Sequence, residues 1–502
     1  MRSSETARRS TGVRMRHKYE KLIGAAVASL TALAVLAPAA QASGPERERP
    51  ALAWSECRPA GAQPDAVRCA RFSVPLDWSR PAGPDRTEIA VARLPATDPG
   101  RRVGTLFFNP GGPGDGEVGY LLDRQTREQY FPSALRERFD IVAVEPRGTG
   151  VNPPLNCPTP IDTSVSRFPA DRAAATDLVR SNRRLGAACA EGGGALFEHL
   201  DTGTVARDVD AVRAALGEQR ISFIGVSYGS MLAQSYAELF PQRVRAMVVD
   251  GVVDRSLSWR RLAELDAAAV EDGVDRFARW SAAQPQSALH DRDVRGLLTA
   301  LLNRADRNEI LDGERPVRAE EIAQAVNTGL QSPLLYSGLA TALAQVDATG
   351  RLEALAPYTT AHNPEYPAYR AIICQDVPVP ADAGAAAALP EAVRRVRAIA
   401  PTLRGYSEFW DIASGCAGWP VRSGFTPHAW RVPADFAPVL LLSGAHDVAT
   451  PPAFADGVRR ALPNSRVLRW DGDGHTAWLN SPATVNAAVG YLTDLTMPAA
   501  AS

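Results

Sequence analysis

The sequence predicts an α/β fold with a doubly wound and mostly parallel β-sheet. Short uncharged runs rich in β-branched residues alternate along the chain with runs whose apolar residues repeat at helical spacing. Strands covered on both faces have this composition because neither side of the sheet meets water. The third observation is a stretch from about 254 to 369 that is rich in alanine, leucine, arginine and glutamate and lacks strand patterns, which predicts a helical insertion.

The expected elements can be placed in chain order. Strands are predicted at 105–108, 141–144, 221–224, 244–249, 439–442 and 467–468. A helix is predicted where Val205, Val209, Val212 and Leu216 fall on one face before Gly217, which ends it. Residues 43 to about 71 contain prolines and cysteines and are expected to form an N-terminal wrap.

These elements divide the chain into four segments. We expect a signal peptide at 1–42, the first part of the α/β core with its wrap at 43–254, a mainly helical cap insertion at 255–431, and the second part of the core at 432–502. A length of 502 residues allows a core domain together with an insertion of this size.

The N-terminus has the parts of a secretory signal. Residues 1–21 are basic, residues 22–37 are apolar, and the sequence APAAQA provides small residues before a cleavage site after Ala42. The apolar run is shorter than the roughly 20 residues that a membrane-spanning helix needs, which disfavours the alternative of an uncleaved anchor. The protein is expected to be secreted or periplasmic, with no membrane span after cleavage.

The charged residues argue against a nucleic-acid partner and against lysine-dependent catalysis. The whole chain has a formal charge of −1, and because the leader carries +5, the rest carries −6. A mildly acidic chain without a basic run argues against nucleic acid as a partner. The only lysines, Lys18 and Lys21, lie in the leader, so the mature chain cannot use a Ser–Lys dyad or a lysine Schiff base.

Six cysteines follow the leader, which predicts disulfides in an exported protein. Six cysteines allow fifteen connectivities, and pairing between sequence neighbours is the simplest of them. No spacing is C-x-x-C, so zinc and redox motifs are not indicated. The simplest pairs are Cys57–Cys69, Cys157–Cys189 and Cys374–Cys416.

A serine lies between two glycines at the junction of a predicted strand and a predicted helix. The sequence GVSYG, residues 225–229, fits G-x-S-x-G, a sharp turn that exposes the serine hydroxyl. Glycines relieve the crowding of such a turn. Ser227 is therefore the candidate nucleophile, and an ordinary glycine-bounded turn is the alternative.

The acid and the base of a serine nucleophile are expected later in the chain, in that order. The sequence GAHDVATP follows the strand at 439–442 and presents Asp447, and the sequence GDGHT presents His475 in a glycine-rich loop. His446 adjoins Asp447, so its side chain diverges from the site. Asp471 and Asp473 are alternative acids that fit a loop-shaping role better.

An oxyanion hole needs two backbone N–H groups aimed at one point. The residue after the nucleophile, Tyr228, supplies one of them. The sequence NPGGPG follows the strand at 105–108, and its glycines allow the backbone to approach a substrate closely. The second donor is therefore expected from this loop.

Several motifs together resemble the secreted tripeptidyl aminopeptidases of actinobacteria, which are α/β-hydrolases. The resemblance rests on NPGGPG, FDIVAVEPRGTG, GVSYGS, GAHDVATP and GDGHT, and more specifically on ASGCAGWP around Cys416. It implies the triad Ser227, Asp447 and His475, and an oxyanion hole at Gly112 and Tyr228. The chain departs from the pattern by placing Asp115 and Glu117 after NPGGPG and by having no cysteine pair after the histidine.

The resulting hypothesis is an exported serine aminopeptidase that acts on peptides with free N-termini and needs no cofactor and no metal. A carboxylesterase with the same triad is the alternative, since fold and triad do not determine the scissile bond. A non-catalytic binding scaffold is a third possibility, disfavoured because the triad is complete.

An aminopeptidase must recognise an ammonium group, and burying that group requires a facing carboxylate. The candidates for this amine site lie on the first cap helix and beside the oxyanion loop: Glu117, Glu264, Asp266 and Glu271, with Asp115 and Asp272 as further members.

Overall fold

The computed structural model describes residues 52–57, 66–114, 116–153, 155, 157, 161–359 and 366–499. The predicted signal peptide, residues 1–42, lies outside these ranges, as does Asp115. Among the helices that are described, none has both the length and the apolar character needed to cross a bilayer.

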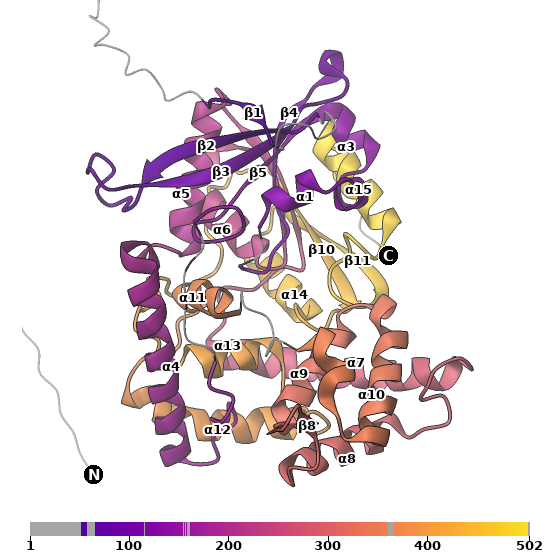
Figure 1. Cartoon of the computed structure of the whole chain (residues 1–502). Helices are drawn as coiled ribbons and strands as arrows, with labels where there is room; N and C mark the ends of the chain where they lie inside the picture. Colours follow the sequence, from indigo (N-terminus) through magenta and orange to yellow (C-terminus); the bar gives the residue numbers. More distant parts are fainter. Residues whose placement is uncertain are drawn as a thin grey trace, which may run out of the picture. The chain divides into compact units, whose positions relative to one another are not determined.

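A nine-stranded sheet forms the centre of the fold, in the order β1-β2-β3-β5-β4-β6-β7-β10-β11. From β5 to β11 all neighbours are parallel, whereas β1, β2 and β3 pair antiparallel at one edge. The predicted doubly wound, mostly parallel sheet is therefore confirmed (Figure 1). The strands are β1 (Ser55–Glu56), β2 (Arg68–Pro75), β3 (Arg86–Leu94), β4 (Gly104–Asn109), β5 (Phe139–Val144), β6 (Ile221–Val226), β7 (Val244–Asp250), β10 (Val439–His446) and β11 (Ser465–Asp473).

Helices cover both faces of the sheet. Apolar side chains of α5, α6 and α14 pack on one face, and those of α1, α3 and α15 pack on the other. Every residue of β5 and β6 is buried, as expected for strands between two helical layers. These helices are α1 (Val118–Leu122), α2 (Arg124–Tyr130), α3 (Ser133–Arg138), α5 (Thr202–Ala215), α6 (Gly229–Leu239), α14 (Pro452–Ala461) and α15 (Pro482–Asp494).

A second group of helices, which we call the helical layer, comprises α4 and α7–α13 and lies beyond the carboxyl ends of the parallel strands (Figure 1). Its buried apolar side chains form a hydrophobic core of their own. A pair of two-residue strands, β8 (Leu311–Asp312) and β9 (Arg315–Pro316), lies within it. Its helices are α4 (Arg172–Gly193), α7 (Trp259–Ala283), α8 (Val294–Asp306), α9 (Ala319–Leu330), α10 (Tyr336–Thr349), α11 (Tyr366–Asp376), α12 (Ala383–Ile399) and α13 (Glu408–Cys416).

Two features differ from the sequence-based expectations. The N-terminal segment contributes the antiparallel strands β2 and β3, which were not predicted because arginines interrupt their apolar pattern. The helical layer also includes α4, which precedes the expected insertion in the chain and packs against α12. The apolar face of α4, with Leu178 and Leu185, is buried by a segment about 200 residues later in the chain, and local spacing cannot predict such a partner.

The three disulfides predicted from neighbouring cysteines are all present: Cys57–Cys69, Cys157–Cys189 and Cys374–Cys416. The last of these joins α11 to α13 inside the helical layer. Each bridge restricts the unfolded chain and is expected to contribute about 2–4 kcal/mol to the free energy of unfolding.

We predict that the purified native protein contains no free thiol. Alkylation before reduction should leave the intact mass unchanged, because every cysteine is paired. Alkylation after reduction in denaturant should add six groups. Labelling of two or more cysteines in the unreduced protein would contradict the three-bridge arrangement.

Candidate active site

Ser227 occupies the sharp turn between β6 and α6. Its φ of 56° lies in the left-handed region, which non-glycine residues rarely adopt. The backbone N–H of Ser227 donates to the carbonyl of Asp250, at the end of β7, over 2.8 Å. This strained conformation, held by the neighbouring strand, is the one expected for a serine that projects from a strand-to-helix turn.

The two flanking glycines are required by close contacts. A Cβ added to Gly225 would lie 2.4 Å from the carbonyl oxygen of Gly229, and one added to Gly229 would lie 2.5 Å from the carbonyl oxygen of Asn109. Both distances are too short for a side chain. The G-x-S-x-G pattern therefore reflects tight packing of α6 against β6 and against the loop after β4.

Asp447 and His475 meet above the ends of β10 and β11. The Nδ1 atom of His475 lies 2.9 Å from Oδ1 and 3.0 Å from Oδ2 of Asp447. The fully buried Asp447 also accepts hydrogen bonds from the backbone N–H groups of Ala449, Thr450 and Thr476. These donors hold the carboxylate in one orientation toward the imidazole ring.

Asp447 and His475 shift each other's pKa. Burial alone would raise the pKa of the Asp447 carboxyl, but the charge of His475 and its hydrogen bond outweigh this and lower the pKa below its usual value. For His475, burial opposes the charged ring, whereas the Asp447 carboxylate favours it and raises the pKa of His475 to about 9.

The other predicted titratable groups near this pair have separate partners. Nδ1 of His446 lies 2.9 Å from Asp272 on α7, so this ring turns away from Asp447. Asp473 forms an ion pair with Arg276, and the side chain of Asp471 is 95% exposed. Of the three acids considered, Asp447 is the one that contacts His475.

Ser227, His475 and Gly112 line one cavity of about 580 Å³. The loop of Gly112 contacts the serine turn, since a Cβ added to Gly111 would lie 2.9 Å from Cβ of Ser227 and 3.5 Å from the backbone nitrogen of Tyr228. No hydrogen bond joins the side chains of Ser227 and His475 among the described residues. Such bonds are often long in the absence of substrate.

Residues from the core and from the helical layer both contribute to this cavity. The core provides the serine turn, the loop after β4 and the histidine loop, and the helical layer provides α9, α11 and the start of α13. The lining residues used below are Ser227, Gly112, His475, Gln324, Asn327, Tyr366, Tyr369, Tyr406, Glu408 and Asp411. A cavity of this size lies within the ~300–1,000 Å³ typical of small-ligand sites.

The four carboxylates proposed for the amine site do not line this cavity. Glu117 is buried beneath the oxyanion loop, where it accepts a hydrogen bond from Asn109. Glu264 pairs with arginines on the surface of the helical layer, and the fully buried Asp266 accepts from the backbone of Phe409. Glu271 bonds to Thr402 and an arginine. Each of these four carboxylates is thus held by a structural partner outside the cavity.

The carboxylates that do line the cavity are Glu408 and Asp411, which the sequence reasoning missed. Both belong to the first turn of α13, which Ser407 caps by accepting from the N–H of Trp410. The sequence SEFWD contains a cap and an acidic first turn, which predicts the start of a helix. It carries no information on what that helix faces.

The surroundings of the two carboxylates differ. Asp411 pairs with Arg167 and Arg370 and accepts a hydrogen bond from Tyr366. Glu408 accepts from the Tyr369 hydroxyl over 3.1 Å, and no arginine pairs with it in the described part of the chain. Burial raises the pKa of Glu408, while the charge of His475 and the Tyr369 hydrogen bond partly offset that rise.

The described residues contain no cluster of three or more histidine, cysteine or acidic side chains that could hold a metal ion.

Comparison with known proteins agrees with this geometry. Residues 104–482 match the alpha/beta hydrolase fold family, a range that includes Ser227, Asp447 and His475. The serine protease Hip1 of Mycobacterium tuberculosis is 30% identical, over 98% of this chain and 98% of that protein. Carboxylesterase B of the same species is 32% identical, over 92% of this chain and 91% of the relative. The tripeptidyl aminopeptidase of Streptomyces lividans is 28% identical, over 84% and 80% respectively.

We predict that His475 titrates above pH 6.5 in the folded protein and that Asp447→Asn lowers its pKa. The folded-state pKa of His475 is raised, so its pairing stabilises the native state fully below about pH 6.5 and this contribution is lost as the pH rises through the folded-state pKa. NMR titration of the imidazole protons measures this, with His475→Gln identifying the resonance. A His475 pKa at or below 6.5, or one unchanged in Asp447→Asn, would contradict the pairing.

Proposed function

The chain belongs to the α/β-hydrolase family and is a serine hydrolase, and on this basis we propose that it is an exported aminopeptidase that releases short peptides, with tripeptides as the expected product, from free N-termini. The observation that supports the proposal is that Ser227, His475 and Glu408 line one cavity, so that a carboxylate shares a cavity with a candidate nucleophile and base.

In the proposed reaction, Ser227 is the nucleophile and His475 is the general base. Nε2 of the neutral ring accepts the proton of Ser227 Oγ while Oγ bonds to the scissile carbonyl carbon, and the ring then gives this proton to the leaving nitrogen as the C–N bond breaks. Water, deprotonated by the same ring, hydrolyses the acyl-enzyme and the proton returns to Oγ. Asp447, bonded to Nδ1, keeps Nε2 directed at the serine.

The backbone N–H groups of Gly112 and Tyr228 are proposed to stabilise the oxyanion. The contact between Gly111 and the serine turn supports this assignment, since the two segments that carry the donors meet there. Removing one such donor typically reduces kcat by about 10²- to 10³-fold. Because both donors are backbone groups, side-chain substitution cannot remove them, and their position depends on the glycines around them.

Glu408 is proposed to bind the substrate ammonium. A buried ammonium needs a facing carboxylate, and Asp411 is already neutralised by two arginines. The Oδ1 atom of Asn327, on α9, is buried without a hydrogen-bond partner among the described residues and lines the same cavity. An unpaired acceptor at this place suits an N–H group of the substrate, which peptides offer and simple esters lack.

The helical layer is proposed to act as the cap that limits how much of a peptide can enter. Tyr366, Tyr369 and Tyr406 from this layer line the cavity and supply apolar surface for the residues before the scissile bond. Export is supported by the three disulfides, since such bridges persist in oxidising compartments.

A carboxylesterase is the alternative function, favoured by the relative of that name at 32% identity. The same serine, base and oxyanion hole would cleave an ester, and the difference lies in whether the ammonium of a peptide contributes to binding. A panel of aminoacyl, dipeptidyl and tripeptidyl anilides against simple acyl esters separates the two functions. The aminopeptidase predicts the highest kcat/KM for an anilide with a free N-terminus.

We predict that Ser227→Ala lowers kcat by roughly 10⁴-fold or more while the protein still folds, because binding and oxyanion stabilisation alone remain. A fluorophosphonate probe should label the parent protein at Ser227 and should not label the variant. Circular dichroism and thermal unfolding provide the control for folding. Labelling at another residue, or full activity in the variant, would refute the assignment.

We predict that N-acetylation of a tripeptidyl anilide lowers kcat/KM by roughly 10²-fold, because Glu408 then faces no ammonium and stays unpaired. In Glu408→Gln the free and acetylated substrates should react at similar rates. Glu264→Gln is the matched control: it removes a helical-layer carboxylate outside the cavity and should retain the discrimination of the parent. Equal turnover of both substrates by the parent would instead favour the esterase.

A further inference from the structure

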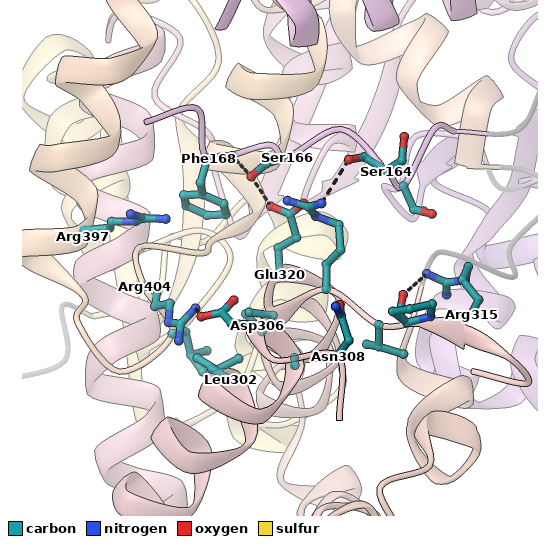
Figure 2. A pocket seen from close by; sticks show the side chains of 18 of the residues that line it. Ser164, Ser166, Phe168, Leu302, Asp306, Asn308, Arg315, Glu320, Arg397 and Arg404 are labelled. Atoms are coloured by element: carbon teal, nitrogen blue, oxygen red, sulfur yellow. Dashed lines mark hydrogen bonds and ion pairs between the residues drawn. The ribbon is translucent and has the colours of Figure 1, made fainter. Parts of the chain in front are cut away.

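A second cavity, of about 850 Å³, lies within the helical layer and has no role in the proposed reaction. Its walls come from residues 163–168, the end of α8, the segment from β9 into α9, and residues 397–404 (Figure 2). Its volume lies within the ~300–1,000 Å³ of sites that hold small ligands.

Four arginines line this cavity, and three of them have carboxylate partners. Arg315 pairs with Asp312 and Glu321, Arg318 with Glu320, and Arg404 with Asp306.

Arg397, on α12, forms no ion pair or hydrogen bond with any of the described residues and instead lies over the Phe168 ring, 5.5 Å from its centroid. Figure 2 shows its guanidinium beside Phe168 at the cavity wall. Arg397 is an exposed residue, so its guanidinium is hydrated, and the charges of Glu320 and Asp306 act on it without a direct ion pair.

Arg397 and Arg404 lie near each other on the same side of the cavity (Figure 2). Burial and the like charge of Arg404 lower the pKa of Arg397, while the charges of Glu320 and Asp306 partly offset that fall. Arg404 itself has a φ of 55°, a left-handed conformation that glycine would adopt at lower cost. An anion between the two guanidiniums would relieve their repulsion, and a planar carboxylate fits such donors well.

The remainder of the cavity is amphipathic. Phe168, Leu302 and Leu403 provide apolar surface, and Ser164 and Asn308 provide polar groups. A purely hydrocarbon ligand would leave these polar groups without partners. The lining therefore suits a molecule that has apolar side chains, backbone-like polar groups and one carboxylate.

The second cavity adjoins the candidate active site. Phe168 lines the second cavity and Tyr406 lines the cavity of Ser227. The centroids of these two rings are 6.4 Å apart. Helix α9 contributes to both cavities: Ala323 lines the second cavity, and Asn327 lines the cavity of Ser227. A short peptide released at Ser227 is generated next to this second cavity.

We propose that the cavity of Arg397 binds a short peptide by its C-terminal carboxylate, with Arg397 and Arg404 holding the carboxylate and an apolar C-terminal side chain resting against Phe168 and Leu302. The choice of a peptide rests on the proposed function, whereas the binding itself requires no turnover. The site would thereby bind the released peptide product or the C-terminal end of a peptide substrate.

Isothermal titration calorimetry of the full-length Ser227→Ala variant with N-acetyl-Ala-Ala-Leu and with its C-terminal amide tests this proposal. The acetyl group removes the ammonium that Glu408 is proposed to bind, and the amide removes the carboxylate. We expect the acid to bind roughly 10- to 100-fold more tightly than the amide, and Arg397→Gln to remove most of that difference.

Matched variants separate the two sites. Arg394→Gln, on the same helix but outside the cavity, and Glu408→Gln, in the other cavity, should leave the acid–amide difference unchanged. Equal binding of acid and amide, or an unchanged difference in Arg397→Gln, would overturn the proposal. Decanoate binding more tightly than the peptide acid, with loss in Arg397→Gln, would overturn the peptide as occupant. None of these outcomes depends on whether Ser227 reacts.

Discussion

The arrangement of the candidate site depends on one buried residue at the end of β7. The backbone carbonyl of Asp250 accepts the N–H of Ser227, and its carboxylate accepts the N–H groups of Ala477 and Trp478, just beyond His475. The serine turn and the histidine loop are about 250 residues apart in sequence, yet both are tied to the same residue. Burial raises the pKa of Asp250 to about 6, while the two backbone donors partly offset that rise. A carboxylate at this position can remain charged because the loop that it holds supplies its hydrogen bonds.

The central sheet fixes the positions of the other residues of the candidate site. Asp250 ends β7, and Ser227 and Asp447 directly follow the neighbouring parallel strands β6 and β10. Ligands bind at these carboxyl ends in open α/β sheets. The register of these strands determines the positions of the three residues relative to one another along the strand direction. The helical layer then closes the opposite side, and it brings two acidic residues of α13 and the unpaired Asn327 to the same cavity.

The helical layer illustrates how charge is distributed in this protein. Arginine is the only strong cation after residue 21, and it neutralises some buried carboxylates of the layer, as Arg167 and Arg370 do for Asp411. The buried Asp266 is held by a backbone N–H group instead. Two charged groups that line cavities form no direct ion pair within the described ranges: Glu408 in one cavity and Arg397 in the other. Both proposals of binding rest on these two groups, because a ligand of opposite charge would give each of them an ion partner.

The sequence by itself determined the parallel core strands, the disulfide pairs and the residues Ser227, Asp447 and His475 as candidates, because each depends on local patterns: uncharged runs, neighbouring cysteines, and glycine-rich turns at strand ends. The antiparallel edge of β2 and β3 and the inclusion of α4 in the helical layer depend on partners distant in sequence. The amine-site candidates Glu264, Asp266 and Glu271 show the same limit, since they share a helix of suitable composition but face arginines or backbone donors, not the cavity. Which carboxylates line the cavity of Ser227 depends on where α13 packs, and only the packing of the helical layer specifies that position.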